Sequence, residues 1–178
     1  MCCAYYIGAR LSEALSFRKT EICPSNIAPV IRMGVNGMET VLLHFGFPGR
    51  DELILNARCE TLLEKPLFRE HAAARRVLVP ATGFHEWNPY RKRFTFCSSD
   101  GSSLYFAGIH DGRNFLIITT EANESLRGVH DRMPLILERS MFADWLSDRT
   151  AIGPILRSRP RQLRRKDSPT QASLLSQS

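Results

Sequence analysis

Three two-residue turn signals divide much of the chain into short apolar runs, and this pattern constrains the fold more than any other feature. The dipeptides Asn36-Gly37, Asp100-Gly101 and Asp111-Gly112 favour tight turns. The runs around them are rich in Val, Ile, Leu, Phe and Thr, which are typical of strands. The sequence therefore predicts a fold built mainly from short strands, with a hairpin at Asn36-Gly37.

The runs predicted to be strands cover residues 27–33, 38–45, 75–81, 83–87, 93–97, 103–110 and 114–120. Two short helices are expected, at 66–75 with Pro66 in the first turn and at 140–147 with Ser140 as its cap. The predicted fold is a strand-dominated α+β domain. Its antiparallel or mixed sheet is expected to curl into a barrel-like form.

Positive charge is concentrated at the C-terminal end. The chain of 178 residues has a formal net charge of +6, and residues 157–178 contain six basic residues and one acid. We expect a single domain over residues 1–157 and a basic, disordered tail over residues 158–178. Such a tail can add salt-sensitive affinity for phosphates, or it can simply be a solubilising terminus.

The five cysteines form no CxxC pair and no zinc-ligand spacing. We therefore expect free thiols, with no metal and no cofactor. No apolar run approaches the length of about 20 residues that spans a membrane. The first residues lack the basic flank and apolar stretch of a signal peptide, so a cytoplasmic location without membrane association is expected.

Cys2 directly follows the initiator Met1. If Met1 is removed, Cys2 carries an α-amine and a thiol on neighbouring carbon atoms. Both groups have accessible nucleophilic forms near neutral pH. The amine can condense with an aldehyde to give a Schiff base, and the thiol can then close a five-membered thiazolidine ring. Taken alone, a cysteine at position 2 more often has no catalytic role.

Three further segments contain polar residues in positions suited to chemistry. Asn56 and Arg58 lie in NARCET (56–61), which can also be read as a helix cap followed by a surface helix. Strand alternation places Glu86 on the same face as Phe84, where burial would raise the pKa of the carboxyl group towards values useful for proton transfer. That face can equally be exposed.

The third segment is VHDRMP (129–134). Here His130 can exchange protons, Asp131 can orient the imidazole ring and Arg132 can hold a phosphate group. Three adjacent polar residues are more often part of a solvated loop.

In their order along the chain, these segments resemble the SOS response-associated peptidase family. The matching landmarks are Met1-Cys2, SNIAP (25–29), NARCET (56–61), PLFRE (66–70), RRVLVPATGFHEW (75–87), FAGIHD (106–111), TTEAN (119–123) and VHDRMP (129–134). They extend from residue 1 to about residue 148. This many matches in the order of the family are not expected by chance.

The resemblance implies a compact β-rich fold with a positively charged cleft for single-stranded DNA. It implies removal of Met1 and a thiazolidine crosslink between Cys2 and the opened sugar of an abasic site, formed by a monomer. By motif, Asn56 orients the amine or the sugar, Glu86 moves protons, and His130 stabilises the sugar oxygen or assists reversal. The implied DNA contacts are Arg58, Trp87, Pro29, Thr120 and Arg132.

The chain departs from the family pattern at several positions. Cys3 and Ala4 replace the usual Gly-Arg, which removes one expected phosphate contact. His85 stands where Tyr is common, and FGFPG (45–49) is shorter and less aromatic than the usual loop. Two other functions remain open: a thiol peptidase that acts on other proteins, and a noncatalytic module that binds single-stranded or modified DNA.

Overall fold

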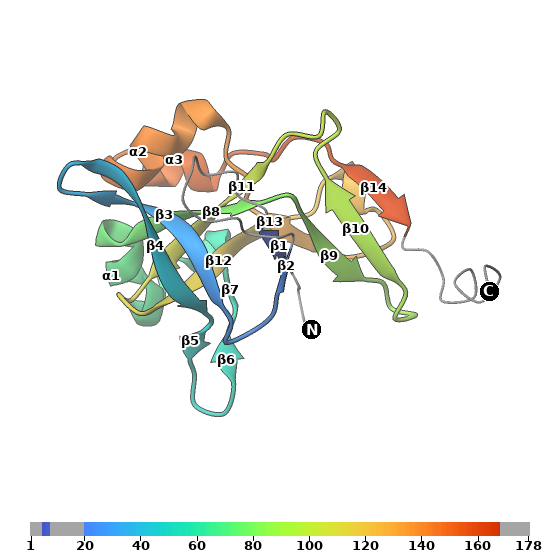
Figure 1. The fold of residues 1–178 in the computed structure, drawn as a ribbon, viewed down its shortest axis with the longest axis horizontal. Helices are drawn as coiled ribbons and strands as arrows, with labels where there is room; N and C mark the ends of the chain where they lie inside the picture. Colours follow the sequence, from blue (N-terminus) through green and yellow to red (C-terminus); the bar gives the residue numbers. More distant parts are fainter. Residues whose placement is uncertain (1–4, 8–19, 168–178) are drawn as a thin grey trace.

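The computed structural model describes residues 5–7 and 20–167 (Figure 1). Cys2, the predicted nucleophile, lies outside the described residues, as do Cys3 and Ala4. None of the helices in the described ranges is long and apolar enough to cross a membrane.

The larger sheet closes on itself. Its strand order is β11 (Leu104–His110), β8 (Arg76–Ala81), β3 (Ile27–Gly34), β4 (Gly37–Phe45), β12 (Asn114–Glu121) and β13 (Arg132–Pro134). Strand β12 also pairs with β11, so the first five strands form a ring. The pairings of β12 with β4 and with β7 (Asn56–Arg58) are parallel and the others are antiparallel. The expected strand-dominated fold with a curled, mixed sheet is confirmed.

The second sheet is antiparallel throughout. It runs in the order β14 (Arg164–Asp167), β10 (Arg93–Cys97), β9 (Gly83–Trp87), β1 (Tyr5–Ile7) and β2 (Thr20–Ile22). Figure 1 shows β9, β10 and β14 extending away from the helices. A small two-stranded sheet, β5 (Phe47–Pro48) with β6 (Leu53–Ile54), projects from the end of β4.

The turn signals of the sequence are used as expected. Strands β3 and β4 form a hairpin in which Gly34 is opposite Gly37, and Gly37 has a φ of 112° that favours glycine. The turn between β11 and β12 has Gly112 at a φ of 112°. Its first residue, Asp111, accepts hydrogen bonds from the backbone N–H groups of Arg113 and Asn114.

The helices are few and short. They are α1 (Pro66–Ala74), α2 (Phe142–Ser147) and α3 (Ile152–Leu156), with 3₁₀ turns η1 (Cys59–Thr61), η2 (Glu124–Leu126) and η3 (Arg139–Met141). Pro66 opens α1 as predicted. The prediction of Ser140 as a helix cap is wrong: η3 contains Ser140, and Met141 is the residue before α2.

Strand β8 separates two apolar clusters. Val77, Val79 and Ala81 pack in the cluster shared with the second sheet, whereas Leu78 packs in the cluster beneath the helices. This division follows from the alternation of side chains along a strand. Trp145 of α2 is fully buried and donates a hydrogen bond from Nε1 to the carbonyl of Val77, 3.0 Å away.

The structure differs from the prediction of a disordered tail over residues 158–167. Strand β14 adds to the edge of β10, with Arg165 opposite Phe96 and Lys166 opposite Thr95. Leu163 is buried in the core cluster of the second sheet. A run of charged residues can join a sheet because its ladder is made by backbone groups, which need no apolar side chains.

Candidate active site

Strand β7 presents Asn56 and Arg58 on one face. The strand runs parallel to β12, with Asn56 opposite Ile117 and Arg58 opposite Thr119. Between them Ala57 is buried, while Asn56 is half-buried and Arg58 is exposed. Because successive side chains of a strand point to opposite faces, both polar side chains point away from the core. NARCET is therefore a strand that leads into the 3₁₀ turn η1, and the alternative of a cap followed by a surface helix is wrong.

His130 is held in one orientation by the loop that contains it. Its Nδ1 accepts a hydrogen bond from the backbone N–H of Arg132 at 2.9 Å. The same nitrogen lies 3.2 Å from the carbonyl oxygen of Arg132 and 3.2 Å from Oδ1 of Asp131. In the neutral ring the N–H contact places the proton on Nε2.

Arg132 and Glu60 form a two-point ion pair. Both terminal nitrogens of Arg132 donate to the carboxylate oxygens of Glu60, at 2.8 Å each, and one also donates to the carbonyl of Thr119 at 2.8 Å. These hydrogen bonds lower the pKa of Glu60 to about 2. A phosphate group that binds Arg132 must therefore share the guanidinium with Glu60 or displace this carboxylate.

Arg58, His130 and Arg132 border the same hollow on the surface. Its volume is about 560 Å³. Because the family resemblance leads us to expect these residues to contact a damaged sugar and its phosphates, we refer to it as the lesion hollow. Its remaining lining residues are Glu121, Ala122, Asn123, Glu124, Arg127 and Asp131. The structure therefore brings together three predicted site residues from two separate motifs, NARCET and VHDRMP. The described residues that line this hollow do not include four other predicted site residues: Asn56, Glu86, Trp87 and Pro29.

Glu86 is buried in β9, with an exposed fraction of 3%. It lies opposite Phe94 of β10, and Phe84 lies opposite Phe96, so the expected shared face of Glu86 and Phe84 is confirmed. The alternative of an exposed face is wrong. A buried carboxyl group with this aromatic neighbour is placed where proton exchange with bulk water is restricted.

On the other face of β9, His85 is also buried, and its Nδ1 lies 2.9 Å from Oγ1 of Thr95. Burial lowers the pKa of His85, so the imidazole stays neutral at physiological pH. Trp87 is half-buried, and its ring meets the ring of His85 edge-on, with the ring centres 6.5 Å apart.

The last two predicted DNA contacts lie on the ring of strands. Pro29 is buried in β3 opposite Leu42. Thr120 is half-buried near the end of β12. Thr120 borders a second hollow rather than the lesion hollow. In the described ranges no group of three His, Cys, Asp or Glu residues is arranged to hold a metal ion.

Sequence reasoning missed Glu60 and Asn123 as parts of the site. Both lie inside landmarks that it identified, NARCET and TTEAN, but their partners are far away in the sequence. Glu60 contacts Arg132, and the side chain of Asn123 contacts Pro160 and Arg161. No local pattern could have predicted either contact.

Comparison with known proteins defines the class. The model of the SOS response associated peptidase (SRAP) family matches residues 9–165, and the chain belongs to this family. Its relatives include abasic site processing protein YoqW of Bacillus subtilis, which is 34% identical over 157 residues, with 77% of this chain and 70% of the relative covered. Abasic site processing protein YoaM of the same organism is 34% identical over 168 residues, covering 80% of this chain and 74% of the relative.

Solved structures share the fold. A protein from Bordetella bronchiseptica superimposes with a TM-score of 0.77 at 20% identity, covering 95% of this chain and all of that one. A protein from Bacteroides thetaiotaomicron gives a TM-score of 0.68 at 25% identity, covering 86% and 78%. The arrangement of strands is therefore common to proteins whose sequences have diverged widely.

Proposed function

We propose that this chain processes abasic sites in single-stranded DNA by forming a covalent thiazolidine crosslink through Cys2. The observation that carries the proposal is the combination of a Met1-Cys2 start with relatives that are named for abasic site processing. The fixed His130, the buried Glu86 and the exposed Arg58 support it, because the reaction needs proton exchange and a phosphate contact.

The chemistry begins with removal of Met1, which frees the amine of Cys2. The amine adds to the C1′ aldehyde of the opened sugar, and loss of water gives an imine. The Cys2 thiol then adds to the imine carbon, and its proton passes to the nitrogen. No oxidant or reductant is consumed. Without thiol addition, the imine can instead lead to strand cleavage by elimination, which gives a lyase-like side reaction.

In this scheme each candidate residue has a defined task. Glu86 accepts and returns the protons of ring opening and imine formation, as a general acid–base group. His130 stabilises the oxygen of the opened sugar, or assists reversal of the crosslink, from its fixed ring position. Asn56 orients the amine or the sugar, and Arg58 binds a phosphate group in the lesion hollow. Further contacts are assigned to Trp87, Pro29, Thr120 and Arg132.

The test uses the full chain and a single-stranded oligonucleotide with one abasic site. A band that survives a denaturing gel is expected for the native protein and for Cys23→Ala, a control that removes an exposed thiol. Cys2→Ala keeps the amine after Met1 removal, so it should give a band only when borohydride reduces the imine. Failure of the native protein to form a stable band would overturn the proposal.

Additional measurements address the finer points. Intact mass should show loss of Met1, and a retained Met1 contradicts the crosslink. A matched duplex should react more slowly than the single strand, and the reactive species should elute as a monomer. Cleavage of casein would instead support a peptidase, and shifts seen only on native gels would support a noncatalytic binding module.

A further inference from the structure

A second hollow continues the lesion hollow towards the C-terminal segment. Its volume is about 400 Å³, and it shares Glu121, Ala122 and Asn123 with the lesion hollow. One part of its lining consists of residues 157–160, with Arg157 and Arg159, and we call this part the far wall; another part includes Thr120. The two hollows share residues 121–123 in their linings and therefore lie next to each other, and we call the two together the extended groove.

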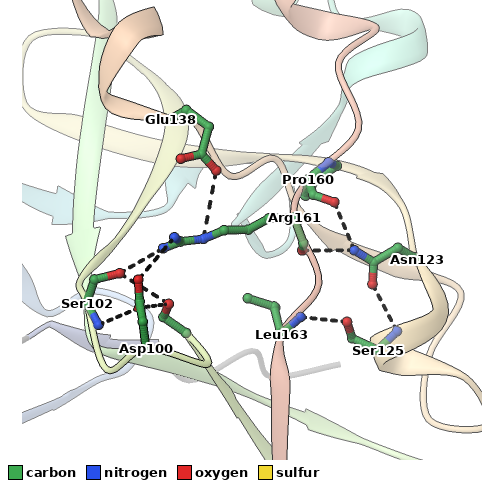
Figure 2. Close-up of polar contacts among 9 residues, drawn as sticks. Asp100, Ser102, Asn123, Ser125, Glu138, Pro160, Arg161 and Leu163 are labelled. Carbon is green, nitrogen blue, oxygen red and sulfur yellow. Dashed lines mark hydrogen bonds and ion pairs between the residues drawn. The ribbon is translucent and has the colours of Figure 1, made fainter.

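The backbone that forms the far wall is held in place by Asn123 and Ser125. The Asn123 side chain accepts a hydrogen bond from the Ser125 N–H at 3.0 Å, and its amide nitrogen lies 3.0 Å from the carbonyl oxygens of both Pro160 and Arg161 (Figure 2). The hydroxyl of Ser125 accepts from the N–H of Leu163 at 2.7 Å. The wall is thereby attached to the turn η2, which begins the loop leading to His130.

Arg161 holds the other side of the same segment. Its guanidinium lies 3.1 Å from the hydroxyl of Ser102, 3.8 Å from the carboxylate of Glu138 and 4.0 Å from that of Asp100 (Figure 2). Strand β14 then continues the segment along the edge of β10. On the other side of residues 157–160, the backbone N–H and the hydroxyl of Ser158 donate to the carbonyl of Ile155 in α3. The segment is thus fixed on both sides, and its cations line the groove without the entropy loss of ordering a free tail.

The charges of this wall are available to a ligand. Arg157 and Arg159 are exposed, and neither forms an ion pair with another described residue, whereas Arg161 does. Two carboxylates face the second hollow. Glu60 is occupied by Arg132, and Glu121 is exposed. Two unpaired guanidinium groups therefore oppose one unpaired carboxylate, which favours an anionic ligand.

We propose that the extended groove binds the sugar–phosphate backbone on one side of the lesion, with Arg157 and Arg159 as phosphate contacts. This inference rests on the proposed function for what occupies the lesion hollow. The groove then contacts the DNA strand beyond the damaged nucleotide. Guanidinium groups at a groove wall bind phosphate without reading the base, so the contact is expected to be independent of sequence.

The test compares two double variants with the same loss of charge. Arg157→Gln/Arg159→Gln removes the wall cations. Arg69→Gln/Arg113→Gln is the matched control, because both residues are exposed and neither borders the groove. Fluorescence anisotropy measures affinity for an undamaged single strand of fifteen nucleotides over a series of salt concentrations. Denaturing gels measure crosslinking rates with the lesion at the 5′ end or at the 3′ end of the oligonucleotide.

The wall variant should bind the undamaged strand about tenfold more weakly than the native protein, with the slope of log affinity against log salt reduced by about 1.4 for two lost contacts. Its crosslinking rate should fall for only one of the two end-placed lesions. Identical behaviour of the wall variant and the control, or equal losses for both lesion positions, would overturn the inference.

The two proposals fail in different ways. If the native protein binds the strand through the wall but never crosslinks it, the proposed reaction is contradicted and the groove assignment stands. If the native protein crosslinks normally and the wall variant behaves like the control, the groove assignment is contradicted and the proposed reaction stands. If the native protein has no affinity for the strand, both proposals are contradicted.

Discussion

Arg132 and Glu60 are joined by two hydrogen bonds of 2.8 Å, although they are 72 residues apart in the sequence. The pair connects strand β13 to the turn η1, and the additional bond from Arg132 to the carbonyl of Thr119 includes β12. The side chain of Arg132 is 16% exposed and that of Glu60 is 46% exposed. Arg132 borders the lesion hollow and Glu60 borders the second hollow, so the pair links the linings of the two hollows while Glu60 remains open to solvent.

Glu60→Gln should reduce stability in a manner that depends on pH. The pKa of Glu60 is lowered from 4.5 to about 2 by the hydrogen bonds from Arg132, so the carboxylate stabilises the folded state above pH 4.5. This contribution declines as pH falls from 4.5 to about 2. The difference in Tm between the native protein and Glu60→Gln should therefore be largest near neutral pH and vanish near pH 2. Glu64→Gln, at an exposed position, should show no such trend.

Glu86→Gln should slow crosslinking by about 10²-fold or more, the typical contribution of general acid–base catalysis. The amide fills the same buried space but cannot exchange a proton, so affinity for an undamaged single strand should not change. Initial rates on denaturing gels measure the effect, with Glu70→Gln on helix α1 as the control. An unchanged rate would remove Glu86 from the mechanism.

Arg58→Ala should weaken binding of single-stranded DNA in a salt-dependent way. Arg58 is exposed at the end of β7 and borders the lesion hollow. Loss of one phosphate contact should reduce the slope of log affinity against log salt by about 0.7. Titrations by anisotropy check this value, and Arg69→Ala serves as the control. If both variants retain the native slope, the phosphate contact assigned to Arg58 is incorrect.

Local patterns predicted the parts of the fold that depend on local chemistry. The turn dipeptides located the hairpin of β3 and β4, and the apolar run at 75–81 located β8. The shared face of Phe84 and Glu86 followed from strand alternation alone. The closure of the ring did not follow from any local pattern, because the parallel pairing of β4 with β12 involves only two residue pairs that are far apart in the sequence.

The sequence was least informative at the C-terminal end. Strand β14 reads RRKD, without any apolar alternation, and its pairing depends on the free edge of β10. Helix α3 is only five residues long and contains Gly153 and Pro154, which are poor helix formers. For the site, the family resemblance gave residues and roles, while the contacts of Glu60, Asn123 and Arg157 required the folded chain.

Asn123 offers a way to separate the anchoring of the C-terminal segment from the capping of η2. Asn123→Ala removes both the acceptor for Ser125 and the donors to Pro160 and Arg161, and it should lower the free energy of unfolding by about 1–3 kcal/mol. Asn123→Asp keeps the capping oxygen and loses only the donors. It should therefore preserve η2 but release the segment.

Hydrogen exchange of the β14 amides reports the release directly, because these amides pair with β10. Both Asn123 variants should accelerate that exchange, and both should weaken binding of single-stranded DNA as the wall of the extended groove becomes mobile. Asn26→Ala, which removes a similar side-chain acceptor from the N–H of Cys23, is the matched control and should leave β14 protected. Protection of β14 that persists in Asn123→Asp would show that the strand pairing alone fixes the wall.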